Sequence, residues 1–115
     1  MLIVYGIPNC DKVKKIINQL EESGFSYEFY NYKKSDPTEE LILRWREHLN
    51  DWPINKRGTT YRKVKDLYEA ADDSEKLNLI IQNSSMIKRP IIEHKNSVVS
   101  IGDLTSFDEF LKKKI

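Results

Sequence analysis

Cys10 is the single cysteine of this chain and the residue best suited to nucleophilic chemistry. It lies in a polar turn between a short apolar run and a stretch with helical periodicity. The free N–H groups and the positive dipole end at the start of a helix stabilise an anion such as a thiolate. A cysteine in this position can ionise well below its ordinary pKa of about 8.5. We therefore predict a reactive thiol at the start of the first helix.

A second interpretation of Cys10 is a small buried hydrophobic residue, and position alone leaves both interpretations open. The polar neighbours Asn9, Asp11 and Lys12 argue against deep burial. Val13 occupies the position at which a Cys-x-x-Cys motif would have its second cysteine. An internal dithiol cycle is therefore excluded, and a redox cycle would need an external thiol such as glutathione or a glutaredoxin.

Two basic segments could bind an anion. Residues 55–63 place four cations around Gly58, and Arg89 directly precedes Pro90 at the entrance of a predicted strand. The forked guanidinium of arginine suits carboxylates and tetrahedral oxyanions. Each segment taken alone is more typical of a solvated charged loop, and the proline could be either cis or an ordinary trans edge-strand residue.

Composition limits the functions that the chain can have. It has 115 residues, with 39% hydrophobic and 32% charged residues and a net charge of +1. This length fits one compact domain, and the charge balance argues against direct nucleic-acid binding. No apolar run is long enough to span a bilayer and no signal peptide is recognisable, so we expect a cytoplasmic protein. One cysteine with His48 and His94 gives no metal-site spacing.

The first third of the chain predicts a strand, a helix and a second strand. Apolar residues form a strand at 2–5, helical periodicity covers 11–23, and alternating aromatics indicate a strand at 26–32. Gly24 lies where a glycine commonly ends a helix. We expect the two strands to be parallel, because a helix connects them.

The remainder predicts helices followed by a hairpin and a last helix. We expect one helix from the start signal Asp36-Pro37-Thr38-Glu39, a short one near 62–68 and another over 74–83. Strands at 91–94 and 98–101 flank a turn at 95–97, and the capping box 106–109 begins the last helix. The predicted class is α/β: one domain over 1–115, with a mixed sheet and a helical insertion at about 36–85.

Three separated motifs carry a resemblance to a known family. They are Asn9-Cys10-Asp11, the segment Arg57-Gly-Thr-Thr-Tyr-Arg-Lys63, and Ile87-Lys-Arg-Pro90. Together with the order of elements they resemble the arsenate reductase-like (ArsC/Spx) family over essentially the whole chain. That family includes glutaredoxin-linked arsenate reductases, Spx-type redox regulators and YffB-like proteins, and the motifs are most similar to those of the YffB-like branch.

The resemblance implies a thioredoxin-like fold and a thiol-dependent reductase without a bound cofactor. Cys10 matches the catalytic cysteine, and Pro90 matches a cis proline that faces it. Arg89, and Arg57 as a second match, would hold the carboxylate of glutathione or a substrate oxyanion. Asn9 and Lys12 would complete the site at the helix start, with glutathione as the reductant. The expected partners are a small thiol or oxyanion and a glutaredoxin, with no nucleic acid and no membrane.

Two departures from the arsenate-reducing branch leave a second function open. That branch carries Cys-Gly-Thr-Ser-Arg where this chain has Cys-Asp-Lys-Val-Lys at 10–14. It also carries a third arginine after the last hairpin, whereas 100–103 has none. The alternative is a non-enzymatic redox-responsive protein of Spx type, in which oxidation of Cys10 changes partner docking. The missing second cysteine is a departure from that type as well.

Overall fold

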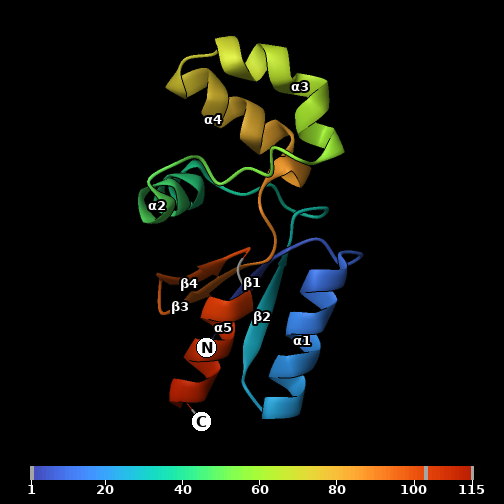
Figure 1. Ribbon diagram of the computed structural model, residues 1–115, viewed down its shortest axis with the longest axis vertical. Helices are drawn as coiled ribbons and strands as arrows, with labels where there is room; N and C mark the ends of the chain where they lie inside the picture. Colours follow the sequence, from blue (N-terminus) through green and yellow to red (C-terminus); the bar gives the residue numbers. More distant parts are fainter. Residues whose placement is uncertain (1, 103, 115) are drawn as a thin grey trace. The chain divides into compact units, whose positions relative to one another are not determined.

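The computed structural model describes residues 2–102 and 104–114, and the chain forms two compact units (Figure 1). The sheet unit comprises Met1–Lys33 and Arg89–Ile115, and the helical unit comprises Lys34–Lys88. The helical unit corresponds to the insertion expected at about 36–85. That the two units fold together as one domain stays a prediction.

The sheet unit confirms the predicted α/β class. Its elements are β1 (Leu2–Gly6), α1 (Asp11–Ser23), β2 (Tyr27–Asn31), β3 (Ile91–His94), β4 (Ser97–Ile101) and α5 (Leu104–Lys114). The strand order is β2-β1-β3-β4, with β1 parallel to β2 and antiparallel to β3. The carboxyl end of β1, the carboxyl end of β2 and the start of β3 therefore lie at the same end of the sheet.

One face of this sheet carries the hydrophobic core of the unit. Helices α1 and α5 lie along it in Figure 1, and side chains of both helices pack with those of β1 and β3. The buried members are Leu2, Val4, Val13, Ile16, Leu20, Ile92, Phe107 and Leu111. Because side chains alternate along a strand, Tyr5, Ile91 and Glu93 face the opposite side.

Helix α1 begins and ends as the sequence predicts. Cys10 is the N-cap, with extended backbone angles (φ −91°, ψ 125°), and its carbonyl accepts the first helical hydrogen bond, from the N–H of Lys14 at 3.0 Å. Gly24 ends the helix in the left-handed conformation at φ 73°. Gly6 allows the close packing of β1 on α1, because a Cβ there would lie 2.7 Å from Cγ2 of Val13.

The β3–β4 hairpin confirms the predicted turn, with one change. Lys95 and Asn96 adopt positive φ angles of 51° and 64°, as a two-residue hairpin turn requires, so β4 begins at Ser97 and not at 98. The predicted start of the last helix is wrong, since α5 already begins at Leu104 and Ser106 lies inside it. The residue before Leu104 is outside the described residues.

The helical unit contains α2 (Glu39–Leu49), α3 (Thr59–Ala70), α4 (Asp73–Gln82) and a short 3-10 helix, η1 (Ser84–Met86). The start of α2 corrects the prediction, because the N-cap is Thr38 and not Asp36. Thr38 Oγ1 accepts a hydrogen bond from the N–H of Leu41 at 3.2 Å. Within the described residues, no helix is both long and apolar enough to cross a membrane.

Helices α3 and α4 are placed correctly, but their limits differ from the prediction. Helix α3 begins at Thr59, three residues before the predicted start, because its N-cap is Gly58, which has no side chain to signal a cap. Helix α4 covers 73–82 and not 74–83. Its N-cap Asp72 accepts a hydrogen bond from the N–H of Glu75 at 2.9 Å.

Candidate thiol site

The Cys10 thiol lies half-buried at the N-terminus of α1. Burial raises the pKa of this thiol, but the backbone N–H of Val13, the Arg89 side chain and the N–H of Lys12 together bring the pKa below its ordinary value. The Cys10 side chain, although Cys10 is the N-cap, accepts no capping hydrogen bond from a backbone N–H of the first turn. The two amides therefore act mainly by stabilising the negative charge of the thiolate.

Among the described residues, Arg89 is the cation whose side chain lowers the Cys10 pKa. Its guanidinium and its positive charge both favour the thiolate and so lower the Cys10 pKa. The Arg89–Pro90 peptide bond is cis, as the resemblance implies. Pro90 is buried at the entrance of β3, and its carbonyl accepts a hydrogen bond from the N–H of Gly102 at 2.8 Å. Cys10 and Arg89, which are far apart in sequence, thus meet at one end of the sheet.

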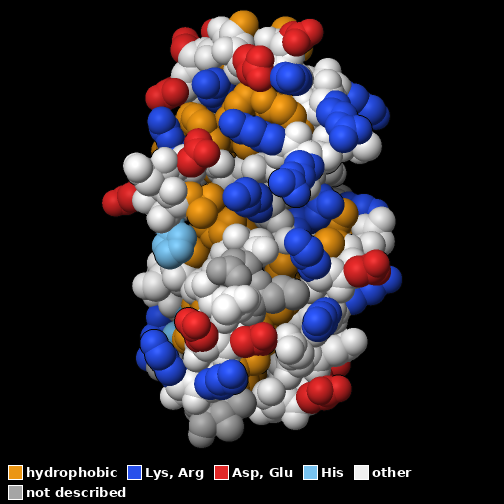
Figure 2. Space-filling model, viewed as in Figure 1, with side chains coloured by type: hydrophobic (Ala, Val, Ile, Leu, Met, Phe, Trp, Pro, Cys, Tyr) orange, Lys and Arg blue, Asp and Glu red, His pale blue; other side chains and the backbone are white. Residues whose placement is uncertain are grey.

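The side chains of the other predicted site residues are not among the groups that lower the Cys10 pKa. The side chains of Asn9 and Lys12 are exposed, and Lys12 acts on the thiol through its backbone amide. Arg57 is exposed in the helical unit, where it lines a cavity of about 530 Å³ with Lys56 and Lys88. Figure 2 shows basic side chains gathered among hydrophobic surface on the face that it displays.

The histidines form no metal site in the part of the chain that the structure describes, where no group of three or more potential ligands occurs. His48 is exposed on α2. His94 packs edge-on against Phe110, with ring centroids 5.3 Å apart. Neither histidine is among the groups that affect the Cys10 pKa.

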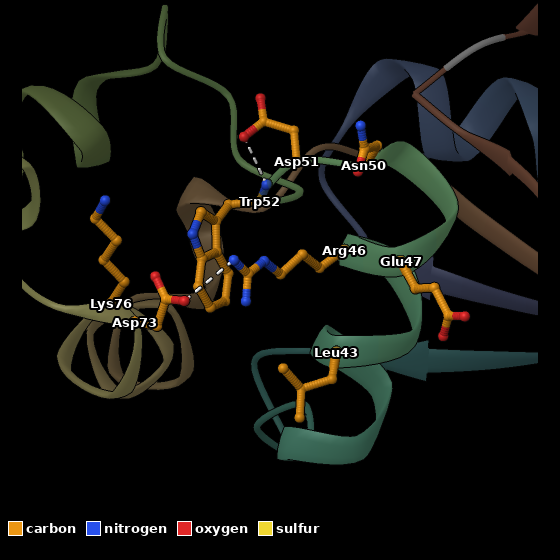
Figure 3. A pocket seen from close by; sticks show the side chains of 8 residues that line it. All are labelled: Leu43, Arg46, Glu47, Asn50, Asp51, Trp52, Asp73 and Lys76. Atoms are coloured by element: carbon orange, nitrogen blue, oxygen red, sulfur yellow. Dashed lines mark hydrogen bonds and ion pairs between the residues drawn. The ribbon is translucent and has the colours of Figure 1, made fainter.

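A second cavity in the helical unit is built around Arg46 and has a structural explanation. It measures about 590 Å³ and lies between α2 and α4 (Figure 3). The Arg46 guanidinium stacks on Trp52 at 4.1 Å from the ring centroid and pairs with Asp73 at 3.2 Å. These contacts connect the two helices and leave the guanidinium engaged on both sides.

Sequence reasoning missed a buried polar group on the sheet face opposite α1 and α5. Glu93 is 1% exposed and accepts a hydrogen bond from the Tyr5 hydroxyl at 2.8 Å. Tyr32 follows β2 and is 3% exposed, but its hydroxyl has no hydrogen-bond partner among the residues that the structure describes. The glutamate inside the apolar run Ile-Ile-Glu of β3 was the available signal, because a buried carboxylate requires a partner.

Comparisons with known proteins place the chain in a family. The family model described as the ArsC family matches residues 5–104. The chain belongs to the ArsC family. A Haemophilus influenzae protein described as uncharacterized is 34% identical over 95 residues, which cover 80% of this chain and 82% of that protein.

Solved structures confirm the thioredoxin-like fold of the family. The YFFB protein matches with a TM-score of 0.81 and 28% identity, over 96% of this chain and 99% of that one. A possible arsenate reductase from Streptococcus mutans matches with a TM-score of 0.78 and 27% identity, over 96% and 97%. A protein from Brucella melitensis described as related to arsenate reductase is 31% identical, with a TM-score of 0.68 over 96% and 94%.

Proposed function

We propose that this protein is a thiol-dependent reductase of the arsenate reductase type, with Cys10 as the nucleophile and glutathione as the reductant. The observation that supports it most is a half-buried thiol at the N-terminus of α1 whose pKa is lowered by backbone amides and by the Arg89 side chain. The thiolate is the reacting form of cysteine, and a cation beside it both maintains the thiolate and attracts an anionic substrate. Membership of the ArsC family and the arsenate reductases among the structural relatives support the same class.

With a glutathione mixed disulfide as substrate, two exchange steps complete the cycle. The Cys10 thiolate attacks the glutathione sulfur of R–S–S–G, forms Cys10–S–S–G and releases R–S⁻. A glutathione thiolate then attacks the same sulfur, releases the Cys10 thiolate and forms oxidised glutathione. The reaction needs no second cysteine, in agreement with Val13 at the position of a resolving thiol.

With arsenate as substrate, the thiolate attacks arsenic and an arsenic-bound oxygen leaves as water after protonation. Two glutathione molecules supply the two electrons, and the balanced reaction gives arsenite, oxidised glutathione and water. Arg89 would offset the charge of the oxyanion beside the thiolate. Arg57 would serve as the second anion-binding residue, and Asn9 and Lys12 would border the substrate at the start of α1. A glutaredoxin is the proposed partner for returning the thiol to its reduced form.

The test is glutathione-dependent reduction of arsenate and, in a separate assay, of a glutathionylated peptide. Turnover by the wild-type protein should be lost in Cys10→Ser and reduced in Arg89→Gln. Lys15→Gln removes a charge from an exposed position on α1 and is the matched control, with turnover expected to be unchanged. Activity on the peptide but not on arsenate would assign the mixed disulfide as the substrate. Absence of turnover in both assays refutes the proposal.

A further inference from the structure

The cavity of about 530 Å³ in the helical unit has both apolar and basic lining residues. Its apolar lining consists of Leu49, which is half-buried, and of Trp52 and Ile54, which are buried. Trp52 is held in place on its other side, since the Arg46 guanidinium stacks on the indole at 4.1 Å from the ring centroid. Pockets for small molecules commonly measure about 300–1,000 Å³. The cavity therefore has the size and the apolar surface to contact the carbon skeleton of a small organic molecule.

Three basic side chains line the same cavity, those of Lys56, Arg57 and Lys88. All three residues are exposed, and none forms an ion pair with another residue that the structure describes. The acidic lining residue is Asp51, whose carboxylate accepts a hydrogen bond from the N–H of Trp52 at 2.8 Å. Three cations and one carboxylate leave a surplus of two positive charges, which is the charge that a bound dianion would neutralise.

Backbone hydrogen bonds hold the two basic segments of this cavity side by side. Ile54 pairs with Ile87 in an isolated antiparallel bridge. Beside this bridge, the N–H of Lys88 donates to the carbonyl of Pro53 at 2.9 Å. Lys56 follows one strand of the bridge and Lys88 follows the other, so cations that are far apart in sequence line one cavity. Because the backbone is already ordered, binding of a ligand does not have to order it.

Helix α3 adds positive potential next to these side chains. It begins at Thr59, two residues after Arg57, and its first turn contains no acidic residue. The N-cap is Gly58, so no side chain caps the free N–H groups of the first turn. The N-terminus of a helix favours a negative charge within about one turn. The helix dipole and the three cations therefore act with the same sign.

We propose that this cavity binds a phosphate monoester with an apolar carbon skeleton. A phosphate monoester carries about 1.5 to 2 negative charges on one group at pH 7, which matches the charge surplus of the cavity. Guanidinium and ammonium groups donate hydrogen bonds to its oxygens, and Leu49 and Ile54 contact the carbon skeleton. Arg57 is the residue that this cavity shares with the proposed function. The inference does not depend on whether Cys10 reacts.

The experiment titrates the whole chain with phenyl phosphate and follows the backbone ¹⁵N–¹H signals of Asn55, Lys56 and Lys88 by NMR. Phenyl phosphate carries the dianion and an apolar ring, whereas inorganic phosphate carries the dianion alone and phenol the ring alone. We expect these signals to shift saturably, with a Kd for phenyl phosphate of about 1 mM or lower and at least about fivefold below that of either other probe. Binding should weaken as salt is added, because salt screens exposed charges.

Variants of the lysines test whether the cavity is the site. Lys56→Gln and Lys88→Gln should each raise the Kd about threefold to fivefold, and the double variant about tenfold or more. Lys65→Gln is the matched control, since Lys65 is exposed on α3 and is not among the lining residues, and its Kd should equal that of the wild-type protein. Alkylation of Cys10 with iodoacetamide should also leave the Kd unchanged.

The outcomes separate this cavity from the thiol site. Absence of saturation up to about 10 mM phenyl phosphate, or equal Kd values in the wild-type protein and the double lysine variant, would overturn the proposal. Loss of binding on alkylation of Cys10 would assign the phosphate to the thiol site and overturn it as well. Inorganic phosphate binding as tightly as phenyl phosphate would contradict an organic ligand. None of these results changes the turnover assays of the proposed function, and failure of those assays leaves the cavity site intact.

Discussion

Substitution of Gly6 by alanine tests how closely the end of β1 must approach α1 to place Cys10. A Cβ at Gly6 would lie 2.7 Å from Cγ2 of Val13, a side chain with no exposed surface. No real Cβ contact is so short, so either the strand end or the helix must move. Because the N–H of Val13 is one of the two amides that lower the Cys10 pKa, this movement should raise the pKa of the thiol.

The expected cost follows from the packing. Overpacking of a well-filled core by one methyl group costs about 1–3 kcal/mol. Gly6 is not in the left-handed region, so alanine brings no backbone strain there and restricts the unfolded chain, a gain of about 0.4–1 kcal/mol. Gly6→Ala should therefore lower the free energy of unfolding by about 0–2.6 kcal/mol, the overpacking cost less that gain.

The assay is urea unfolding of a double-mutant cycle. Val13→Ala removes Cγ2 and so removes the clash, although it is destabilising by itself. In the Val13→Ala background, Gly6→Ala should be neutral or stabilising, which gives a coupling free energy of at least about 1 kcal/mol between the two sites. Equal effects of Gly6→Ala in both backgrounds would refute the argument that Gly6 is required by its approach to Val13.

Three further predictions concern the thiol, the helical unit and the hairpin. Because the folded pKa of Cys10 is below its unfolded pKa, the thiolate should stabilise the wild-type protein relative to Cys10→Ser above the unfolded pKa. This advantage should disappear as the pH falls through the folded pKa, as pH-dependent urea unfolding will show. Arg46→Ala should lower the free energy of unfolding by about 1–2 kcal/mol through loss of the Trp52 stack and the Asp73 pair, with Asp73→Asn costing less than about 1 kcal/mol. Asn96→Ala should cost about 1–2 kcal/mol in thermal unfolding, because alanine is strained at φ 64°, whereas Ser97→Ala, an exposed control at the start of β4, should stay within about 0.5 kcal/mol.

The sheet unit was predictable because its signals are local. Apolar alternation, helical periodicity and Gly24 determine β1, α1 and β2, and they agree with one another. Helix starts were less predictable, since several residues near each start are able to cap. Thr38 rather than Asp36 caps α2, and Gly58 caps α3 with no side-chain hydrogen bond. The start of α5 was missed because the sequence 106–109 fits a capping box although it lies inside the helix.

The thiol site was predictable in part. Cys10 follows from its place before a helix, and the motif at Pro90 indicated Arg89 as a partner. The buried Tyr5–Glu93 contact and the buried Tyr32 hydroxyl were not predictable, because both depend on the register of three strands. Alternating aromatics in 26–32 indicate a strand equally well whether a hydroxyl is buried or exposed. Only the register shows that Tyr32 lies at the end of the sheet where the Cys10 turn follows β1.

The pH dependence of Cys10 alkylation by iodoacetamide, in the folded protein and in urea, is the most direct test of an activated thiol. In the wild-type protein the folded midpoint should lie below the unfolded midpoint, and Arg89→Gln should move the folded midpoint upward. Lys15→Gln should leave it in place. A folded midpoint at or above the unfolded one, unaffected by Arg89→Gln, would contradict the assignment of Cys10 as a nucleophile held as its thiolate by Arg89 and the first turn of α1.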